Sequence, residues 1–159
     1  LLGSIMDLGC GTGLFGVEIN QFCKHLEGID LSEKMLHKAK EKDVYNKLIK
    51  QDIVDYLSNV SLNFDYFIST DVFVYIGDLS DVFRLIKSSN KTGGKLAFST
   101  EHYDGDSFFL EQSGRYSHSK KYIESLCKTF GYELRHFETQ AIRKEKGRYL
   151  TGGLYLLDF

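Results

Sequence analysis

A chain of 159 residues has the size of one domain and can bury roughly 70% of the surface that its unfolded form exposes, so a single core is expected. The formal charge of −2 offers no basic excess that would favour nucleic acid or an anionic membrane surface. The three cysteines are far apart and no apolar run approaches the roughly 18 residues of a membrane span, which argues against disulfides, bound metal and a membrane anchor and favours a cytoplasmic location.

Strands and helices are predicted to alternate along most of the chain. A short apolar run that stops at a glycine indicates a buried strand at residues 4–8, and apolar residues at helical spacing follow it as far as residue 22. Further apolar runs predict strands at residues 25–30, 47–50, 64–69 and 95–100. Helices are expected between them, with Ser32 and Asp78 as caps, and again over residues 122–130. This alternation implies a parallel sheet with right-handed crossovers.

The end of the chain breaks the alternation. Residues 132–143 and 148–159 are two extended runs on either side of a charged turn at residues 144–147, a pattern typical of a β-hairpin. A closing hairpin adds antiparallel strands to the parallel sheet. The predicted fold is therefore α/β and Rossmann-like, a mostly parallel seven-stranded sheet with helices on both faces and a C-terminal antiparallel hairpin, in a single domain over residues 1–159.

A glycine-rich turn follows the first predicted strand. Gly9, Gly11 and Gly13 let the backbone turn tightly without Cβ atoms, so a ligand can lie against bare main chain. The helix that follows offers free N–H groups to a carboxylate or phosphate. Asp7, at the last turn of the strand, places a carboxylate near the cationic end of such a ligand.

Two more acids stand where a bound nucleoside would need them. Asp30 ends the second strand and can accept hydrogen bonds from both ribose hydroxyls. Asp52 ends the third strand, where it can accept from an adenine amino group while Ile53 packs on the ring. Each acid alone is equally well explained as a helix cap. Their occurrence at the tips of consecutive strands, after a glycine turn, favours a nucleoside site.

This combination resembles the class I S-adenosylmethionine-dependent methyltransferases, which share the acid, the Gly-x-Gly-x-Gly turn, the two later acids and the terminal hairpin. The resemblance implies S-adenosylmethionine as the cofactor and S-adenosylhomocysteine as the product. It implies that Asp7, Gly9, Gly11 and Gly13 hold the methionine part, Asp30 the ribose, and Asp52 with Ile53 the adenine. Residues 69–73, with Thr70, are then expected under the methyl donor. Cys10 and Leu31 complete the expected cofactor-binding set, Cys10 as a small filler rather than a reactive thiolate.

A finer likeness is to the bacterial tetratricopeptide-associated methyltransferases and the related Williams–Beuren-region methyltransferase-like proteins. It rests on residues 71–79 and 114–119. Any repeat domain is expected upstream of Leu1, because no repeat occurs in this chain. Members of the class also carry a helix before the first strand that covers the cofactor, and the domain is expected to lack it.

Several side chains are candidates for contact with the methyl acceptor. Tyr75, His102 and His118 are candidate catalytic groups, His102 and His118 as general bases if the nucleophile arrives protonated. Arg115 suits an acidic group of the substrate because its planar guanidinium matches a carboxylate or phosphate, and Tyr116 lies beside it. Each histidine can equally cap a helix or bind substrate, and each tyrosine can equally form a wall of the site.

Three alternatives stay open. A nicotinamide dinucleotide oxidoreductase would use Gly11, Gly13 and Gly16 as Gly-x-Gly-x-x-Gly, but it would leave Asp52 without a role. A cofactor-binding domain without catalysis is the second alternative. An RNA methyltransferase is the third, although a chain with no proline cannot contain an Asn-Pro-Pro-Tyr motif. The acceptor is therefore expected to be a small molecule or a carrier-bound acid rather than nucleic acid.

Overall fold

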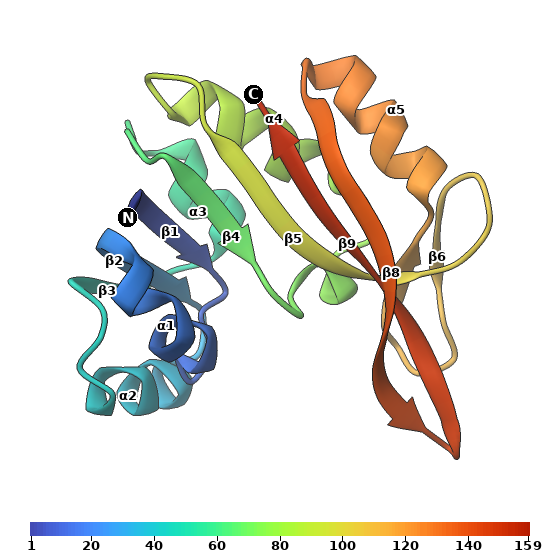
Figure 1. The fold of residues 1–159 in the computed structure, drawn as a ribbon, viewed down its shortest axis with the longest axis horizontal. Coiled ribbons are helices and arrows are strands. Elements are labelled where there is room, and N and C mark those ends of the chain that lie inside the picture. The colour runs from blue at the N-terminus through green and yellow to red at the C-terminus, as the bar shows by residue number, and fades with distance from the viewer.

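The computed structural model describes residues 1–159 as one nine-stranded sheet with helices against it (Figure 1). The strands are β1 (Leu2–Leu8), β2 (Cys23–Asp30), β3 (Lys47–Lys50), β4 (Tyr66–Ser69), β5 (Lys95–His102), β6 (Phe108–Leu110), β7 (Tyr116–His118), β8 (Glu133–Glu145) and β9 (Arg148–Asp158). The α-helices are α1 (Leu14–Ile19), α2 (Glu33–Glu41), α3 (Ile53–Ser58), α4 (Ser80–Ser89) and α5 (Lys120–Phe130). Two short 3-10 helices, η1 (Asn20–Phe22) and η2 (Phe73–Tyr75), complete the chain.

The sheet confirms the predicted mixed α/β architecture. Strands β3, β2, β1, β4 and β5 are parallel neighbours in that order, and β9 runs antiparallel to β5 with β8 on its far side. Two further strands were not predicted from the sequence. Beyond the end of β4, the last two residues of β5 pair with Ser117 and His118 of β7, and β6 pairs with β7. With three residues each, β6 and β7 are too short to show a periodic pattern.

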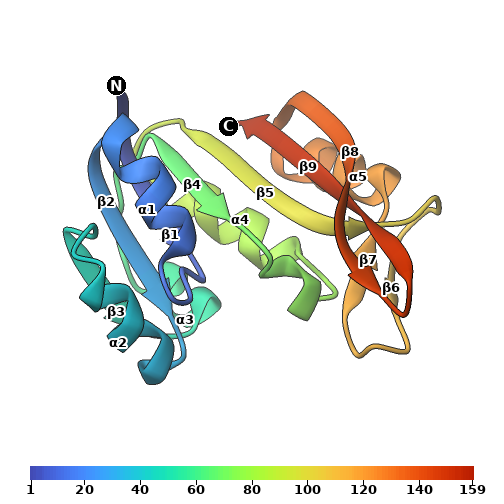
Figure 2. The ribbon, with the colours of Figure 1, turned by 60° about the horizontal axis from the view of Figure 1, so that its bottom comes forward.

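Helices cover both faces of the sheet. Successive side chains of β1 point to opposite faces, so each face carries apolar residues that a helix can bury. Met6 and Leu8 belong to the large apolar cluster, which also contains buried residues of α3, α4 and α5. Ile5 points the other way and packs with Phe15 and Ile19 of α1 in a smaller cluster. Figure 2 shows α1 and α4 on opposite sides of the sheet. No helix is both long enough and apolar enough to cross a membrane.

The helix boundaries follow from local capping, with two departures from the sequence prediction. Ser32 caps α2 as expected, because its side chain accepts from the Met35 N–H at 3.3 Å. Asp78 lies one residue before the cap position of α4 and accepts from the Ser80 N–H at 2.9 Å. The helix expected as far as residue 22 ends at Ile19, and η1 continues the chain. Both departures are small shifts at helix ends, where regular hydrogen bonding stops.

The β8–β9 hairpin extends beyond the strand that it joins. Residues 152–158 of β9 pair with β5, whereas residues 148–151 pair only with β8. The turn is tighter than the predicted four residues, because Lys146 and Gly147 alone form it, both with positive φ (48° and 76°). In Figure 1 this end of the hairpin projects away from the parallel strands.

Replacing Phe83 by Ala tests the large apolar cluster. Phe83 is fully buried, with its ring 5.0 Å from that of Tyr132 and 5.8 Å from that of Phe98. We expect Phe83→Ala to lower the free energy of unfolding by about 3–5 kcal/mol, measured by chemical denaturation. Phe109→Ala is the control, since Phe109 is 54% exposed, and should stay within about 0.5 kcal/mol. Equal losses in the two variants would contradict this assignment of the core.

Candidate functional site

A cleft of about 680 Å³ lies at the carboxyl ends of the parallel strands. In an open α/β sheet, ligands bind at this edge. The cleft is lined by the turn after β1, the ends of β2 and β3, and the loop after β4. From the predicted set it brings together Gly9, Gly11, Asp30, Leu31, Asp52, Ile53, Thr70 and Tyr75.

The glycine turn between β1 and α1 has a backbone conformation that favours glycine at three positions. Gly9, Gly11 and Gly13 all have positive φ, 75°, 55° and 83°. A Cβ at Gly9 would overlap the side chain of Val72, whereas a Cβ at Gly11 would point into empty space. Gly11 therefore presents bare backbone to the cleft. Gly13 and Cys10 lie behind it, and burial raises the pKa of the Cys10 thiol to about 12, which agrees with an inert filler.

Asp30 joins the glycine turn to the end of β2. Its Oδ2 accepts from the Gly11 N–H at 2.9 Å, and its Oδ1 accepts from the Ser32 N–H at 2.8 Å. One carboxylate thereby sets the position of the turn and of the start of α2. It remains half-buried on the wall of the cleft, where it can accept further hydrogen bonds.

Asp7 is the most buried acid of the predicted set, at 1% exposure. Its Oδ2 accepts a hydrogen bond from the Tyr45 hydroxyl at 2.7 Å, while its Oδ1 is buried without a partner. Burial raises the pKa of Asp7 to about 6, the bond from Tyr45 lowers it, and the charge of Asp30 raises it. Asp7 therefore holds a buried carboxylate with spare acceptor capacity behind the turn.

Tyr45 is a site residue that the sequence analysis missed. It lies in the loop between α2 and β3, where no periodicity marks it. Its ring fills space left by glycines, because a Cβ at Gly16 or Gly28 would overlap it. The signal in the sequence was indirect: two glycines outside the turn, whose missing side chains make room for one large residue.

Asp52 caps a helix and also lines the cleft. Its Oδ1 accepts from the Val54 N–H at 2.8 Å and the Asp55 N–H at 3.1 Å, so it caps α3. It also lines the cleft, exposed, beside the buried side chain of Ile53. Capping uses one oxygen and leaves the other free to bind a ligand.

Tyr75 and Arg115 meet at the rim of the cleft. Tyr75 is 61% exposed and follows β4 in η2, whereas Arg115 precedes β7. Arg115 Nη2 donates to the Tyr75 hydroxyl at 3.1 Å, and its guanidinium lies 5.3 Å from the centre of the Tyr75 ring. Arg115 is therefore connected to the cleft through Tyr75.

Three predicted residues lie outside the cleft lining in addition to Asp7, Cys10, Gly13 and Arg115. His118 is fully buried, with Nε2 2.9 Å from the carbonyl oxygens of both Ile76 and Gly77, and burial lowers its pKa. The expectation that it reaches the mouth of the site is corrected, because in this position it anchors residues 76–77 from behind. Tyr116 packs against Gly77. His102 faces a second cleft of about 740 Å³, with Nε2 3.3 Å from Asp104 Oδ1.

Comparison with known proteins gives a family match over nearly the whole chain. The model described as methyltransferase domain matches residues 3–151. A malonyl-(acyl-carrier protein) O-methyltransferase of Ilyobacter polytropus is 34% identical over 102 residues, 61% of this chain and 37% of the relative. An 18S rRNA (guanine-N(7))-methyltransferase of Arabidopsis thaliana is 39% identical over 49 residues, 31% of this chain and 17% of the relative. The chain thus spans less than half the length of these curated relatives.

Solved structures share the fold. A magnesium protoporphyrin IX methyltransferase from Synechocystis PCC 6803 superimposes with a TM-score of 0.72 at 20% identity, covering 99% of this chain and 69% of that protein. An S-adenosylmethionine-dependent methyltransferase from Clostridium acetobutylicum gives a TM-score of 0.73 at 20% identity, covering 99% and 84%. At this identity the likeness establishes the architecture of the chain.

Replacing Tyr45 by Phe tests the environment of Asp7. The pKa of Asp7 rises from 3.8 to about 6 on folding, so the folded chain binds more protons between these values and this group destabilises the fold as pH rises through them. We expect Asp7 in Tyr45→Phe to titrate at higher pH than in the parent chain, because the donor that stabilises its charged form is lost. At pH 7.5 the free energy of unfolding should fall by about 1–2 kcal/mol.

Carbon-detected NMR of the aspartate carboxyls measures the titration, and chemical denaturation measures the stability. Tyr149→Phe is the matched control, since Tyr149 is 64% exposed, and should change neither quantity. An Asp7 midpoint near 4 in the parent chain, or the same midpoint in Tyr45→Phe, would refute the assignment.

Proposed function

The chain belongs to the methyltransferase domain family, and from this we propose that it is an S-adenosylmethionine-dependent methyltransferase with its cofactor in the cleft beside the glycine turn. The observation that carries the proposal is the cradle formed by Gly11 and Asp30, bare backbone held in place by a carboxylate that keeps acceptor capacity toward the cleft.

The residues of the cleft fit the three parts of this cofactor. Asp7 lies behind the turn and outside the residues that line the cleft, and it has one buried oxygen without a hydrogen-bond partner, which suits the cationic end of the methionine moiety. Asp30 faces the cleft where it can accept from ribose hydroxyls, and Asp52 has a free oxygen for an adenine amino group. Ile53 and Leu31 supply apolar surface for the base.

Catalysis by this chain consists mainly of alignment. The bound cofactor supplies a methyl group on a positively charged sulfur, which is already a good leaving group. The protein then has to hold an acceptor in line with that methyl group and keep water away. Thr70 lines the floor of the cleft after β4, and Tyr75 forms its exposed rim.

Tyr75 is the catalytic candidate that we retain for direct contact with the acceptor. Its hydroxyl accepts from Arg115, so its own proton is free to be donated to a substrate oxygen. His118 acts as a positioning residue through the backbone of Ile76 and Gly77. His102 keeps a proposed role only for an acceptor that extends into the second cleft.

We propose a small molecule or a carrier-bound acid as the acceptor. The relatives named as malonyl-(acyl-carrier protein) O-methyltransferases align over 60% or more of the chain, whereas the rRNA methyltransferase aligns over 31%. The formal charge of −2 also provides no general attraction for RNA.

The finer relationship to the tetratricopeptide-associated and Williams–Beuren-region groups is also part of the proposal. Its two supporting segments, residues 71–79 and 114–119, pack against each other through the Tyr75–Arg115 bond and the bonds of His118. Their contact supports a shared acceptor-side structure.

Replacing Asp30 by Ala tests the cofactor site. The variant loses the acceptor for ribose and the two bonds that hold the turn, so we expect its dissociation constant for S-adenosylhomocysteine to rise at least tenfold, which is about 1.4 kcal/mol. Isothermal titration calorimetry measures it. Asp81→Ala, at the start of α4 and outside the cleft, should keep the parent affinity. Unchanged affinity in Asp30→Ala would sink the proposed site.

An assay of isotope-labelled methyl transfer tests whether the chain is an enzyme or a binding domain without catalysis. With malonyl-acyl-carrier protein and free dicarboxylic acids as acceptors, we expect label in the acceptor and loss of it in Tyr75→Ala. A nicotinamide dinucleotide should give no thermal shift, whereas S-adenosylhomocysteine should raise the melting temperature. Stabilisation by the dinucleotide alone would favour the oxidoreductase instead.

A further inference from the structure

Four charged side chains form a closed ring between the two clefts. Arg115 Nη1 lies 3.8 Å from Asp71 Oδ1 and 3.6 Å from Glu101 Oε1. Arg143 Nη1 lies 3.5 Å from the same oxygen of Asp71, and Nη2 of Arg143 contacts Glu101 Oε1. The members come from the loop after β4, the end of β5, the segment before β7 and strand β8, so the ring exists only in the folded chain.

The two acids of the ring are held very differently. The Glu101 side chain is 6% exposed and contacts both arginines, so it is a fixed part of the interior. The Asp71 side chain is 62% exposed, and its distances of 3.5 and 3.8 Å exceed hydrogen-bond length. Asp71 is therefore the loosely bound member.

One donor of the ring is left without a hydrogen bond. Arg115 Nη1 is buried and has no hydrogen-bond partner, although both acids lie within 4 Å. A buried N–H group of a guanidinium without an acceptor is costly. The two arginines thus have more donor capacity than Glu101 and Asp71 use.

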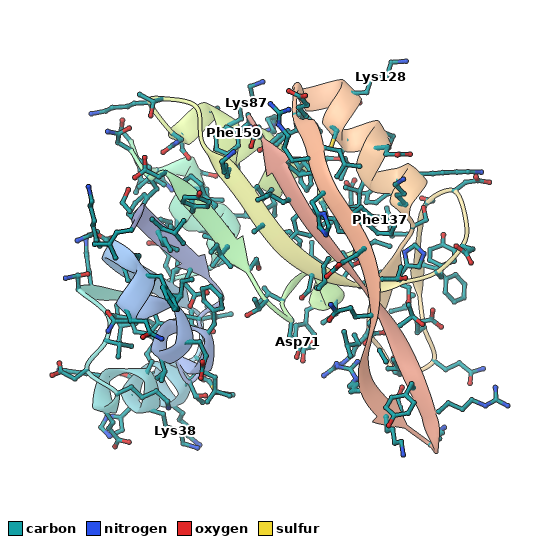
Figure 3. All side chains as sticks on the ribbon, viewed as in Figure 1. Lys38, Asp71, Lys87, Lys128, Phe137 and Phe159 are labelled. Atoms are coloured by element: carbon teal, nitrogen blue, oxygen red, sulfur yellow. The ribbon has the colours of Figure 1, made fainter.

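The ring borders the cleft that holds the proposed cofactor site. Asp71 and Tyr75 line this cleft, and Arg115 is bonded to Tyr75. Figure 3 shows Asp71 just past the carboxyl end of β4, between the strands that carry the glycine turn and the β8–β9 hairpin. On the opposite side, acidic and basic side chains both line the second cleft, and the Glu101 carboxylate that faces it already contacts both arginines. An anionic group therefore reaches the arginines from the side of Asp71 and Tyr75.

We propose that Arg115 and Arg143 form the binding site for a carboxylate of the methyl acceptor, a site that the exposed Asp71 side chain loosely occupies when no acceptor is bound. This inference rests on the proposed function and narrows its acceptor to carboxylic acids. Two guanidinium groups facing one carboxylate supply paired, charge-assisted hydrogen bonds. The bond from Arg115 to Tyr75 then places the acceptor beside the candidate catalytic residue.

Binding of malonate, the simplest dicarboxylate probe, tests the site. The titration is followed by NMR at constant ionic strength, with and without saturating S-adenosylhomocysteine, so that the anion site is tested whether or not the cofactor binds. We expect Asp71→Asn to bind malonate about fivefold more tightly than the parent chain, because a competing carboxylate is removed. Arg143→Gln should bind it at least tenfold more weakly, and Arg143→Lys should fall between, because it keeps the charge without the planar fork.

The matched control is Arg135→Gln. Arg135 lies on the same strand β8, but it is paired with Glu133 and Asp158 and should not affect malonate binding. A ring with a purely structural role would instead give a lower melting temperature in Asp71→Asn with unchanged or weaker malonate binding, and this result would overturn the proposal.

Two further results would also overturn it: equal malonate affinity in Arg143→Gln and the parent chain, and tighter binding of inorganic phosphate than of malonate. Loss of S-adenosylhomocysteine binding with the malonate series intact would reject the proposed function alone. Normal cofactor binding with no response in the malonate series would reject the carboxylate site alone.

Discussion

The arrangement of the cleft depends on the hydrogen bonds by which the Asp30 carboxylate holds the glycine turn. A turn with three positive-φ glycines is costly to order, because glycine loses more conformational freedom on folding than any other residue. Asp30 offsets this cost by accepting from the N–H groups of Gly11 and Ser32 at once. The same carboxylate therefore orders the bare backbone that faces the cleft and the start of α2. Tyr45 supports the turn from behind, where it fills the space beside the glycines and donates to Asp7.

The first half of the molecule could be predicted from the sequence because its signals are local. The first two parallel strands are apolar runs that stop at a glycine and at an acid, and a third acid follows shortly after the next strand, at the sheet edge where ligands bind. The parallel sheet and the shared cleft of Gly11, Asp30 and Asp52 follow from these signals. These signals could not decide whether an acid at a strand end caps the next helix or faces a ligand. Asp52 caps α3 and also faces the cleft, so the structural alternative is confirmed while the proposed contact with a ligand stays open to the same side chain.

The contacts of the second half could not be predicted from the sequence, because they join segments that are far apart along the chain. The strands β6 and β7 have three residues each and exist because β5 extends beyond β4 and offers a free edge. His118 had the sequence position of a site residue, but pairing with β5 turns it into the interior, where two carbonyl groups hold it. Arg143 is predicted only as the last residue of an extended run, because nothing local shows that β8 crosses beside the loop after β4. Periodicity gives the secondary structure of such segments but not their partners.

The two halves of the molecule differ in how freely their residues can be exchanged, and this bears on the choice of methyl acceptor. The glycine turn and Asp30 lie at the ends of strands whose preceding residues belong to the apolar core, so the fold fixes the position of this wall of the cleft. The acceptor side is built from a loop, two three-residue strands and one arm of a hairpin, joined by ion pairs and the Tyr75–Arg115 bond. Exposed residues there, such as Asp71 and Tyr75, can be exchanged at little cost to the apolar core, because neither belongs to it. A shared fold therefore says little about the acceptor, and in our proposal the charged groups around Asp71 select it.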